Sequence, residues 1–190
     1  MSIVREFCFT DMFKFNRLAW DPFIEDYNLS FFVTKMLQFP MLSQAVLAPN
    51  EQLMGYLLGE SDKAAAGDHQ LYGHVSVLAV DSEYRRLGVG SKLLERFHQL
   101  MEQQQKWYVS LYVRMNNRSA MRLYESLGYV KYSWLPNFYP DDHGYSLRLP
   151  LATDVAGKTL QGQQFIIKFY FIIMHVMLLI RAVLKFVLRH

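Results

Sequence analysis

The run Arg85-Arg86-Leu87-Gly88-Val89-Gly90 contains residue types that can hold a pyrophosphate. It follows the apolar stretch Val75 to Val80 and opens a helix-patterned segment at Ser91. A strand that leads through a glycine turn into a helix directs free backbone N–H groups to one point, where the helix dipole also favours negative charge. Gly88 and Gly90 allow the backbone to come close to a ligand or to adopt a positive φ. The guanidinium groups of the two arginines present forked N–H donors that pair well with phosphate. The spacing predicts a pyrophosphate-binding turn.

Two familiar phosphate motifs do not fit this run. A Walker loop needs Gly-Lys followed by Ser or Thr, and the dinucleotide fingerprint needs three spaced glycines. The run instead resembles the Arg/Gln-x-x-Gly-x-Gly/Ala turn with which GNAT-superfamily acetyltransferases hold acetyl-coenzyme A. The alternative is an ordinary surface turn that caps a helix. The expected coenzyme-binding residues of the turn are Arg85, Arg86, Leu87, Gly88, Val89, Gly90 and Ser91.

Acetyl transfer to an amine needs a held thioester, a neutral amine, oxyanion stabilisation and a proton for the departing thiolate. We expect the backbone of Leu78, Ala79 and Val80 to meet the pantetheine arm and the thioester carbonyl. Tyr124 is the candidate proton donor, and the Asn117 amide the candidate ligand for coenzyme or substrate. Each has a structural alternative, since buried tyrosines usually only pack and asparagine commonly caps helices.

Longer runs of residues narrow the resemblance from the GNAT superfamily to one family within it. Gly73 to Val80, Glu83 to Gly88, Val113 to Asn117 and Leu123 to Tyr129 together resemble the catalytic subunits of NatB-type N-terminal acetyltransferases. The resemblance covers residues 1–150.

That resemblance implies an enzyme that acetylates the α-amino group of nascent chains beginning Met-Asp, Met-Glu, Met-Asn or Met-Gln. It implies acetyl-coenzyme A as co-substrate, and a helical-repeat auxiliary subunit and the ribosome as partners. Tyr124 and Asn117 match catalytic positions that also contact the coenzyme. The matched substrate-binding positions are Tyr27, His74, Ser76 and Tyr139. Neither a metal nor direct contact with nucleic acid is implied.

The chain departs from the family pattern in the loop before the last strand and, most of all, in its hydrophobic tail, where the family usually ends in a polar segment. The family typically has adjacent tyrosines in the loop before the last strand, whereas this chain has Phe138-Tyr139 and lacks one hydroxyl there. Gly90 stands where the family often has alanine. Other functions stay open: a GNAT enzyme acting on a small amine or lysine, or a catalytically silent adaptor that keeps the fold.

Composition and charge restrict the class of protein. The 190 residues are 52% hydrophobic, which suits one globular domain plus an extra segment. Residues 151–190 carry five basic residues and one acidic residue, a net +4, so the first 150 carry −1 of the total +3. The body therefore lacks the basic field of a nucleic-acid-binding protein. Cys8, the single cysteine, excludes an internal disulfide, favours a cytoplasmic location and is expected to be buried.

Hydrophobic patterning predicts an α/β GNAT fold with a mixed, mostly antiparallel sheet flanked by helices. The expected strands are Ile3 to Phe7, Ser43 to Ala48, Leu53 to Glu60, Gly73 to Val80, Tyr108 to Val113, Tyr129 to Trp134 and Tyr145 to Leu149. A first helix is expected after an N-cap at Thr10-Asp11, a second between Leu18 and Pro40, and others at Ser91 to Gln105 and Ser119 to Leu127. Ser61 to Gln70 is expected to be a flexible loop.

The sequence divides into a domain at residues 1–150, a linker at 151–164 and a hydrophobic, amphipathic tail helix at 165–190. The uncharged stretch Phe169 to Ile180 is shorter than the roughly 20 residues that span a bilayer. Its flanking charges share one side of a helix. We expect a peripheral membrane anchor or a groove-binding helix, with packing on the domain itself as the alternative.

Overall fold

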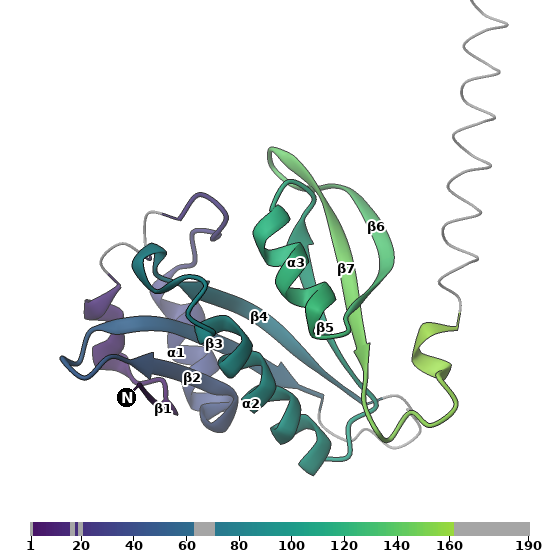
Figure 1. Ribbon diagram of the computed structural model, residues 1–190, viewed down its shortest axis with the longest axis horizontal. Coiled ribbons are helices and arrows are strands. Elements are labelled where there is room, and N and C mark those ends of the chain that lie inside the picture. The colour runs from purple at the N-terminus through teal and green to yellow at the C-terminus, as the bar shows by residue number, and fades with distance from the viewer. Residues whose placement is uncertain (1, 16–17, 19–20, 63–70, 162–190) are drawn as a thin grey trace, which may run out of the picture.

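Seven strands form one sheet in the computed structural model, which describes residues 2–15, 18, 21–62 and 71–161 (Figure 1). The spatial order is β1-β2-β3-β4-β5-β7-β6, and neighbouring strands are antiparallel except for the parallel pair β4 and β5. The strands are β1 (Ile3–Glu6), β2 (Ser43–Leu47), β3 (Leu53–Ser61), β4 (Tyr72–Val80), β5 (Tyr108–Arg114), β6 (Val130–Tyr139) and β7 (Asp142–Pro150).

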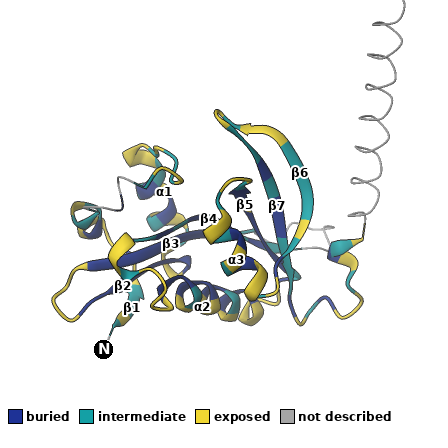
Figure 2. Cartoon of the chain, turned by 45° about the horizontal axis from the view of Figure 1, so that its top comes forward, coloured by how far each residue is buried: buried dark blue, intermediate teal, exposed yellow. Residues whose placement is uncertain are grey.

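Helices cover both faces of the sheet. The α-helices are α1 (Leu29–Gln38), α2 (Val89–Gln103) and α3 (Arg118–Ser126), and the 3-10 helices are η1 (Phe9–Lys14), η3 (Pro40–Leu42), η4 (Ser82–Tyr84) and η5 (Lys158–Leu160). Helices α2 and α3 pack on one face, where they share a core cluster with all the central strands. Helix α1 and the N-terminal segment form a second core cluster on the opposite face (Figure 2). The element order predicted from sequence is confirmed, with a 3-10 helix in the first helical position.

Helix α2 shows how the pattern determines the packing. Its apolar residues recur at helical spacing, and Phe97 and Met101 are fully buried against the sheet. Glycines lie beneath them: a Cβ on Gly59 would come 2.2 Å from the Phe97 ring, and one on Gly73 would come 2.3 Å from the Met101 sulfur. The strands thus provide the space for large α2 side chains.

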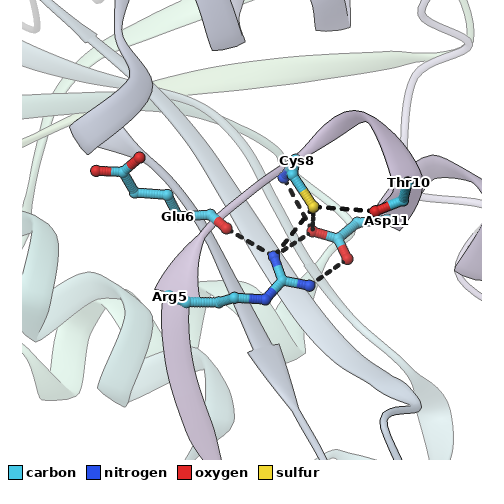
Figure 3. A network of polar contacts seen from close by, with 5 residues as sticks. All are labelled: Arg5, Glu6, Cys8, Thr10 and Asp11. Carbon is cyan, nitrogen blue, oxygen red and sulfur yellow. Dashed lines mark hydrogen bonds and ion pairs between the residues drawn. The ribbon is translucent and has the colours of Figure 1, made fainter.

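The predicted N-cap of the first helix is wrong. Helix η1 begins at Phe9, three residues before the expected start at Met12, with Cys8 as its N-cap. The Asp11 carboxylate reaches back to accept from the Cys8 backbone N–H at 2.9 Å, and both of its oxygens accept from the Arg5 guanidinium at 2.6 Å (Figure 3). Cys8 is exposed because it stands at this helix start, so the expected buried thiol is also wrong.

The loop expected before the last strand is mostly strand. Strand β6 extends to Tyr139 and β7 begins at Asp142, so Phe138 and Tyr139 belong to β6. Register irregularities between Leu135 and Tyr139, with Asn137 at a φ of 51°, let the two strands stay paired up to this tip. The polar Asp142 to Gly144 stretch concealed the hairpin in the sequence pattern.

The first part of the expected linker packs against β7. Thr159 is fully buried, its carbonyl accepts from Arg148 at 2.7 Å, and its hydroxyl donates to the Asp154 carboxylate at 2.5 Å. Within the described parts of the chain, no helix has the length and apolar character needed to cross a bilayer. The tail expected at 165–190 and most of the loop expected at Ser61 to Gln70 lie outside the described residues.

Candidate active site

A cavity of about 770 Å³ lies where β4 and β5 separate. The two strands pair only as far as Val75 and Leu111, then diverge (Figure 1). Opposite β3, Val77 pairs with Leu58 and Val75 with Gly59, which leaves Ser76 as the extra residue of a β-bulge. Because a bulge bends and twists its strand, β4 turns away from β5 at this point. Its edge residues beyond Val75 then line the cavity.

The predicted pyrophosphate turn forms one end of this cavity. Gly88 is the N-cap of α2 at a φ of 77°, the left-handed region that favours glycine. Val89, Gly90 and Ser91 follow as the first helical turn, and all three line the cavity. Backbone N–H groups of a first turn have no partner within the helix, and the dipole adds partial positive charge. The helix begins at Val89, two residues before the predicted Ser91, so Val89 and Gly90 of the predicted turn belong to its first helical turn.

Gly90 has a second role in packing. A Cβ at this position would lie 3.0 Å from the Leu123 side chain on α3. The small residue therefore lets α3 approach the start of α2 and narrows the cavity between the two helices.

The two arginines of the turn differ in their surroundings. Arg85 donates to the Val80 carbonyl at 3.2 Å and forms an ion pair with Asp21 at 2.6 Å. It thereby connects the turn to the N-terminal loop that borders the cavity. Arg86 is exposed at a φ of 61°, and both arginines lie on the cavity wall.

Tyr124 of α3 is buried and lines the cavity between β4 and β5. Its ring packs edge-on against Tyr129 with centroids 5.6 Å apart, and the Tyr129 hydroxyl hydrogen-bonds His98 at 2.9 Å. Burial raises the pKa of the Tyr124 phenol, and the nearby Tyr139 raises it further. The hydroxyl therefore stays protonated at neutral pH, as a general acid must.

Asn117 has the structural role that its residue type indicates. It is the N-cap of α3, where its side-chain oxygen accepts from the Ala120 N–H at 3.1 Å. It also lines the cavity, so its amide NH₂ can donate to a ligand while its oxygen caps the helix.

The four predicted substrate residues converge on the opposite end of the cavity, which they all line. The Tyr27 hydroxyl donates to the Ser76 carbonyl at 3.4 Å, and His74 Nδ1 lies 2.9 Å from the Ser110 hydroxyl. Burial lowers the pKa of His74, so its imidazole is neutral at pH 7. Burial raises the pKa of Tyr139, which keeps that hydroxyl protonated.

Arg114 is a site residue that sequence reasoning did not single out, although it lies in the run Val113 to Asn117. At the end of β5, its guanidinium donates to Glu25 at 2.6 Å from the loop before α1, and it pairs with Asp141 at the β6–β7 turn. It also lies over the Tyr139 ring at 4.4 Å. This cation, whose side chain is 10% exposed, thus holds together the loop before α1 and the β6–β7 turn, which both border the cavity.

Two predicted coenzyme residues lie away from the cavity wall. The Ala79 side chain is buried in the core cluster beneath α1, and Leu87 is 66% exposed. The others, including Leu78 and Val80, line the cavity. Among the described residues, no group of three or more His, Cys, Asp or Glu side chains is placed to hold a metal ion.

Comparison with known proteins agrees with this geometry. Residues 12–129 match the acetyltransferase (GNAT) family. The chain belongs to the GNAT acetyltransferase family. Members of this family use acetyl-coenzyme A, which fits a cavity with a helix start at one end and a buried, protonated tyrosine beside it.

Its relatives within the GNAT family are N-terminal acetyltransferases. The chain is 30% identical over 162 residues to the N-terminal acetyltransferase B complex catalytic subunit NAA20 of Arabidopsis thaliana, covering 84% of this chain and 91% of the relative. It is 30% identical over 174 residues to the corresponding subunit of Schizosaccharomyces pombe, covering 87% and 95%. The structure of Chaetomium thermophilum Naa20 in complex with a bisubstrate analogue matches with a TM-score of 0.76 and 28% identity over 81% of this chain and 89% of that one. The chain is an acetyl-coenzyme A dependent N-terminal acetyltransferase.

For this GNAT turn we expect Gly88→Val to raise the Kd for acetyl-coenzyme A at least tenfold. A branched side chain is strained at a φ of 77°, so the turn must change shape and redirect its N–H groups. Calorimetric titration measures the Kd. Gly157→Val is the matched control, because Gly157 is the N-cap of η5 at a φ of 62° and lies outside the cavity wall. Equal affinities for wild type and Gly88→Val would exclude the turn as the pyrophosphate site.

Proposed function

We propose that this enzyme is of NatB type and acetylates the α-amino group of proteins that begin Met-Asp, Met-Glu, Met-Asn or Met-Gln. The observation that carries the proposal is the arrangement of the cavity. A helix start lies at one end, the polar side chains of Tyr27, His74 and Tyr139 lie at the other, and Tyr124 lines the wall between the diverging strands. The relatives named as catalytic subunits of the N-terminal acetyltransferase B complex support the assignment to the NatB type.

In the proposed reaction, acetyl-coenzyme A binds with its pyrophosphate at Gly88 to Ser91 and its extended arm along the free edge of β4. Such an arm can hydrogen-bond to a strand edge as an added strand would. The neutral substrate amine attacks the thioester carbonyl from the His74 side and the C–S bond breaks. Tyr124 gives its proton to the departing sulfur and regains one from the attacking nitrogen, which loses a proton as the amide forms. An α-amine has an ordinary pKa of about 8, so a fraction is neutral at pH 7 without a strong base.

His74 suits both acidic and amide side chains at the second substrate position. Its Nδ1 lies 2.9 Å from the Ser110 hydroxyl, which can accept from Nδ1–H while it donates to the Gly73 carbonyl at 3.4 Å, or can donate to Nδ1 instead. In the first arrangement Nε2 can accept from an amide, and in the second it can donate to a carboxylate. Phe23 and Phe138 line the cavity with exposed apolar surface suited to the initiator methionine.

We include an auxiliary subunit in the proposal. Large apolar side chains are exposed mainly near the N-terminus: seven of the twelve such residues in the described parts of the chain come from the first 41 positions. They are Ile3, Phe9, Phe13, Phe23, Leu29, Leu37 and Met41. Exposed apolar surface of this kind commonly marks a protein interface. A similar fold occurs in the solved structure of the NatB acetyltransferase complex bound to a bisubstrate inhibitor. We also propose that the enzyme acts on nascent chains at the ribosome in the cytoplasm. We propose as well that its tail contacts membranes.

A peptide panel that varies the first two residues tests the specificity. We expect kcat/KM for Met-Asp and Met-Glu peptides to exceed that for Met-Leu and Ser-Ala peptides by at least tenfold, because buried polar groups left without a partner typically cost about 1 to 3 kcal/mol. His74→Ala should reduce that preference. The panel is run with and without a candidate auxiliary subunit. A flat profile would instead indicate a GNAT enzyme for lysine or small amines.

A further inference from the structure

An ion pair stands beside the substrate end of the cavity. Lys35 of α1 donates to the Glu60 carboxylate of β3 at 2.6 Å. Glu60 pairs in register with His74 on β4, and its other oxygen lies 3.5 Å from the Ser76 hydroxyl. The pair therefore contacts the wall residues from the side of the sheet that α1 covers.

Lys35 is held in a place where its charge requires a partner. The residue is 7% exposed, and its ammonium lies over the ring faces of Phe31 at 5.4 Å and Phe39 at 5.9 Å. Burying a cation is costly unless it is paired. The Glu60 side chain is 40% exposed, so its negative charge lies between the buried ammonium and the solvent beside the cavity.

The two charges act on His74 in opposite directions. After burial, which lowers the pKa of His74 most, Glu60 raises that pKa and Lys35 lowers it. The titratable groups that face the imidazole are Glu60 from β3, Lys35 from α1 and Tyr112 from β5, whose ring centroid is 5.0 Å away. While the pair is intact, the opposite charges offset each other at this wall.

We propose that the Lys35–Glu60 ion pair determines how the enzyme responds to charge on the second residue of its substrate. The proposal rests on the proposed function, in which that residue meets His74 and Ser76. With Lys35 present, the Glu60 charge is offset and an aspartate side chain is accepted. Without Lys35, the unpaired Glu60 repels an anionic substrate and leaves its neutral isostere unaffected. The pair is thus a specificity determinant that acts through its field, not by touching the reacting atoms.

The test compares kcat/KM for a Met-Asp peptide and the matching Met-Asn peptide at low ionic strength, where screening is weak. Lys35→Met should lower the Asp/Asn ratio by roughly three- to tenfold, and Glu60→Gln should raise it by a similar factor. The double variant K35M/E60Q should return the ratio to that of wild type. This rescue separates a charge effect from a packing defect. If Lys35→Met fails to fold, Glu60→Gln and the double variant, which leaves no buried charge unpaired, provide the test.

Equal ratios in all four proteins would overturn the proposal. The proposal would also be overturned if Lys35→Met lowered kcat/KM equally for both peptides and Glu60→Gln did not rescue that loss. The His74 titration, followed by NMR, is independent of activity: its pKa should rise in Lys35→Met and fall in Glu60→Gln, and an unchanged pKa would contradict the proposal. If wild type acetylates neither peptide, the proposed function fails, while the titration still decides whether the pair acts on His74.

Discussion

Tyr124→Phe is expected to lower kcat at least tenfold while the Kd for acetyl-coenzyme A changes by less than about twofold. The substitution keeps the buried ring and its contact with Tyr129, but it removes the only proton that this side chain can give to the departing thiolate. Since the pKa of Tyr124 is raised by burial, the acid is fully protonated at neutral pH. Loss of its proton therefore should not limit kcat until the pH exceeds the ordinary tyrosine value of about 10.

Steady-state kinetics and calorimetry on the same preparations measure both quantities. Tyr129→Phe is the matched control, because Tyr129 is an adjacent buried tyrosine that bonds His98 and does not line the cavity. It should destabilise the fold slightly and leave kcat near that of wild type. An unchanged kcat in Tyr124→Phe would remove Tyr124 from the mechanism.

Arg114→Leu should lower kcat/KM for the peptide by roughly 30- to 100-fold, mainly through KM. The guanidinium ties Glu25 and Asp141, from the loop before α1 and the β6–β7 turn, to the end of β5. Without it, two carboxylates lose their partner and both segments can move away from the bound peptide. The Kd for acetyl-coenzyme A should stay within about twofold, because the turn at Gly88 depends on α2 and not on this contact.

Two further variants make the test specific. Arg114→Lys keeps the charge but loses the forked geometry that reaches two carboxylates, so it should restore only part of the activity. Arg148→Leu removes another arginine that lies over a tyrosine ring, at 4.4 Å from the centroid of Tyr108. Arg148 contacts η5, where it donates to the Thr159 carbonyl. It should lower Tm and leave the peptide KM unchanged. Equal losses of peptide and coenzyme binding in Arg114→Leu would contradict the role assigned to Arg114.

Local patterns were enough to predict most of the fold. The apolar spacing of α2, the alternation in the strands and the N-cap at Asn117 are properties of neighbouring residues, and all three are seen in the structure. The start of η1 was missed because Asp11 caps it from inside the helix, three residues after Cys8. The β6–β7 hairpin was shortened because long-range pairing, not residue type, keeps its polar tip in strand conformation.

The turn and helix start that line one end of the cavity were predictable because they are contiguous in sequence. The turn and the helix start occupy adjacent positions, so their geometry follows from the order of residues. The bulge at Ser76 was not predictable, since the apolar alternation of β4 continues unchanged through it. The contacts of Arg114 span 89 residues to Glu25 and 27 to Asp141, and Lys35 meets Glu60 across 25. Charge pairs at such separations depend on tertiary packing, which a single sequence does not reveal.

The most direct test of the account is to locate the transferred acetyl group. A Met-Asp peptide with one internal lysine is incubated with the full chain and isotope-labelled acetyl-coenzyme A, and fragment ions from mass spectrometry assign the label to an atom. We predict label on the α-amine alone, and none on the same peptide with a blocked N-terminus. Label on the lysine ε-amine, or equal labelling of the blocked peptide, would contradict N-terminal acetyl transfer in the cavity between β4 and β5.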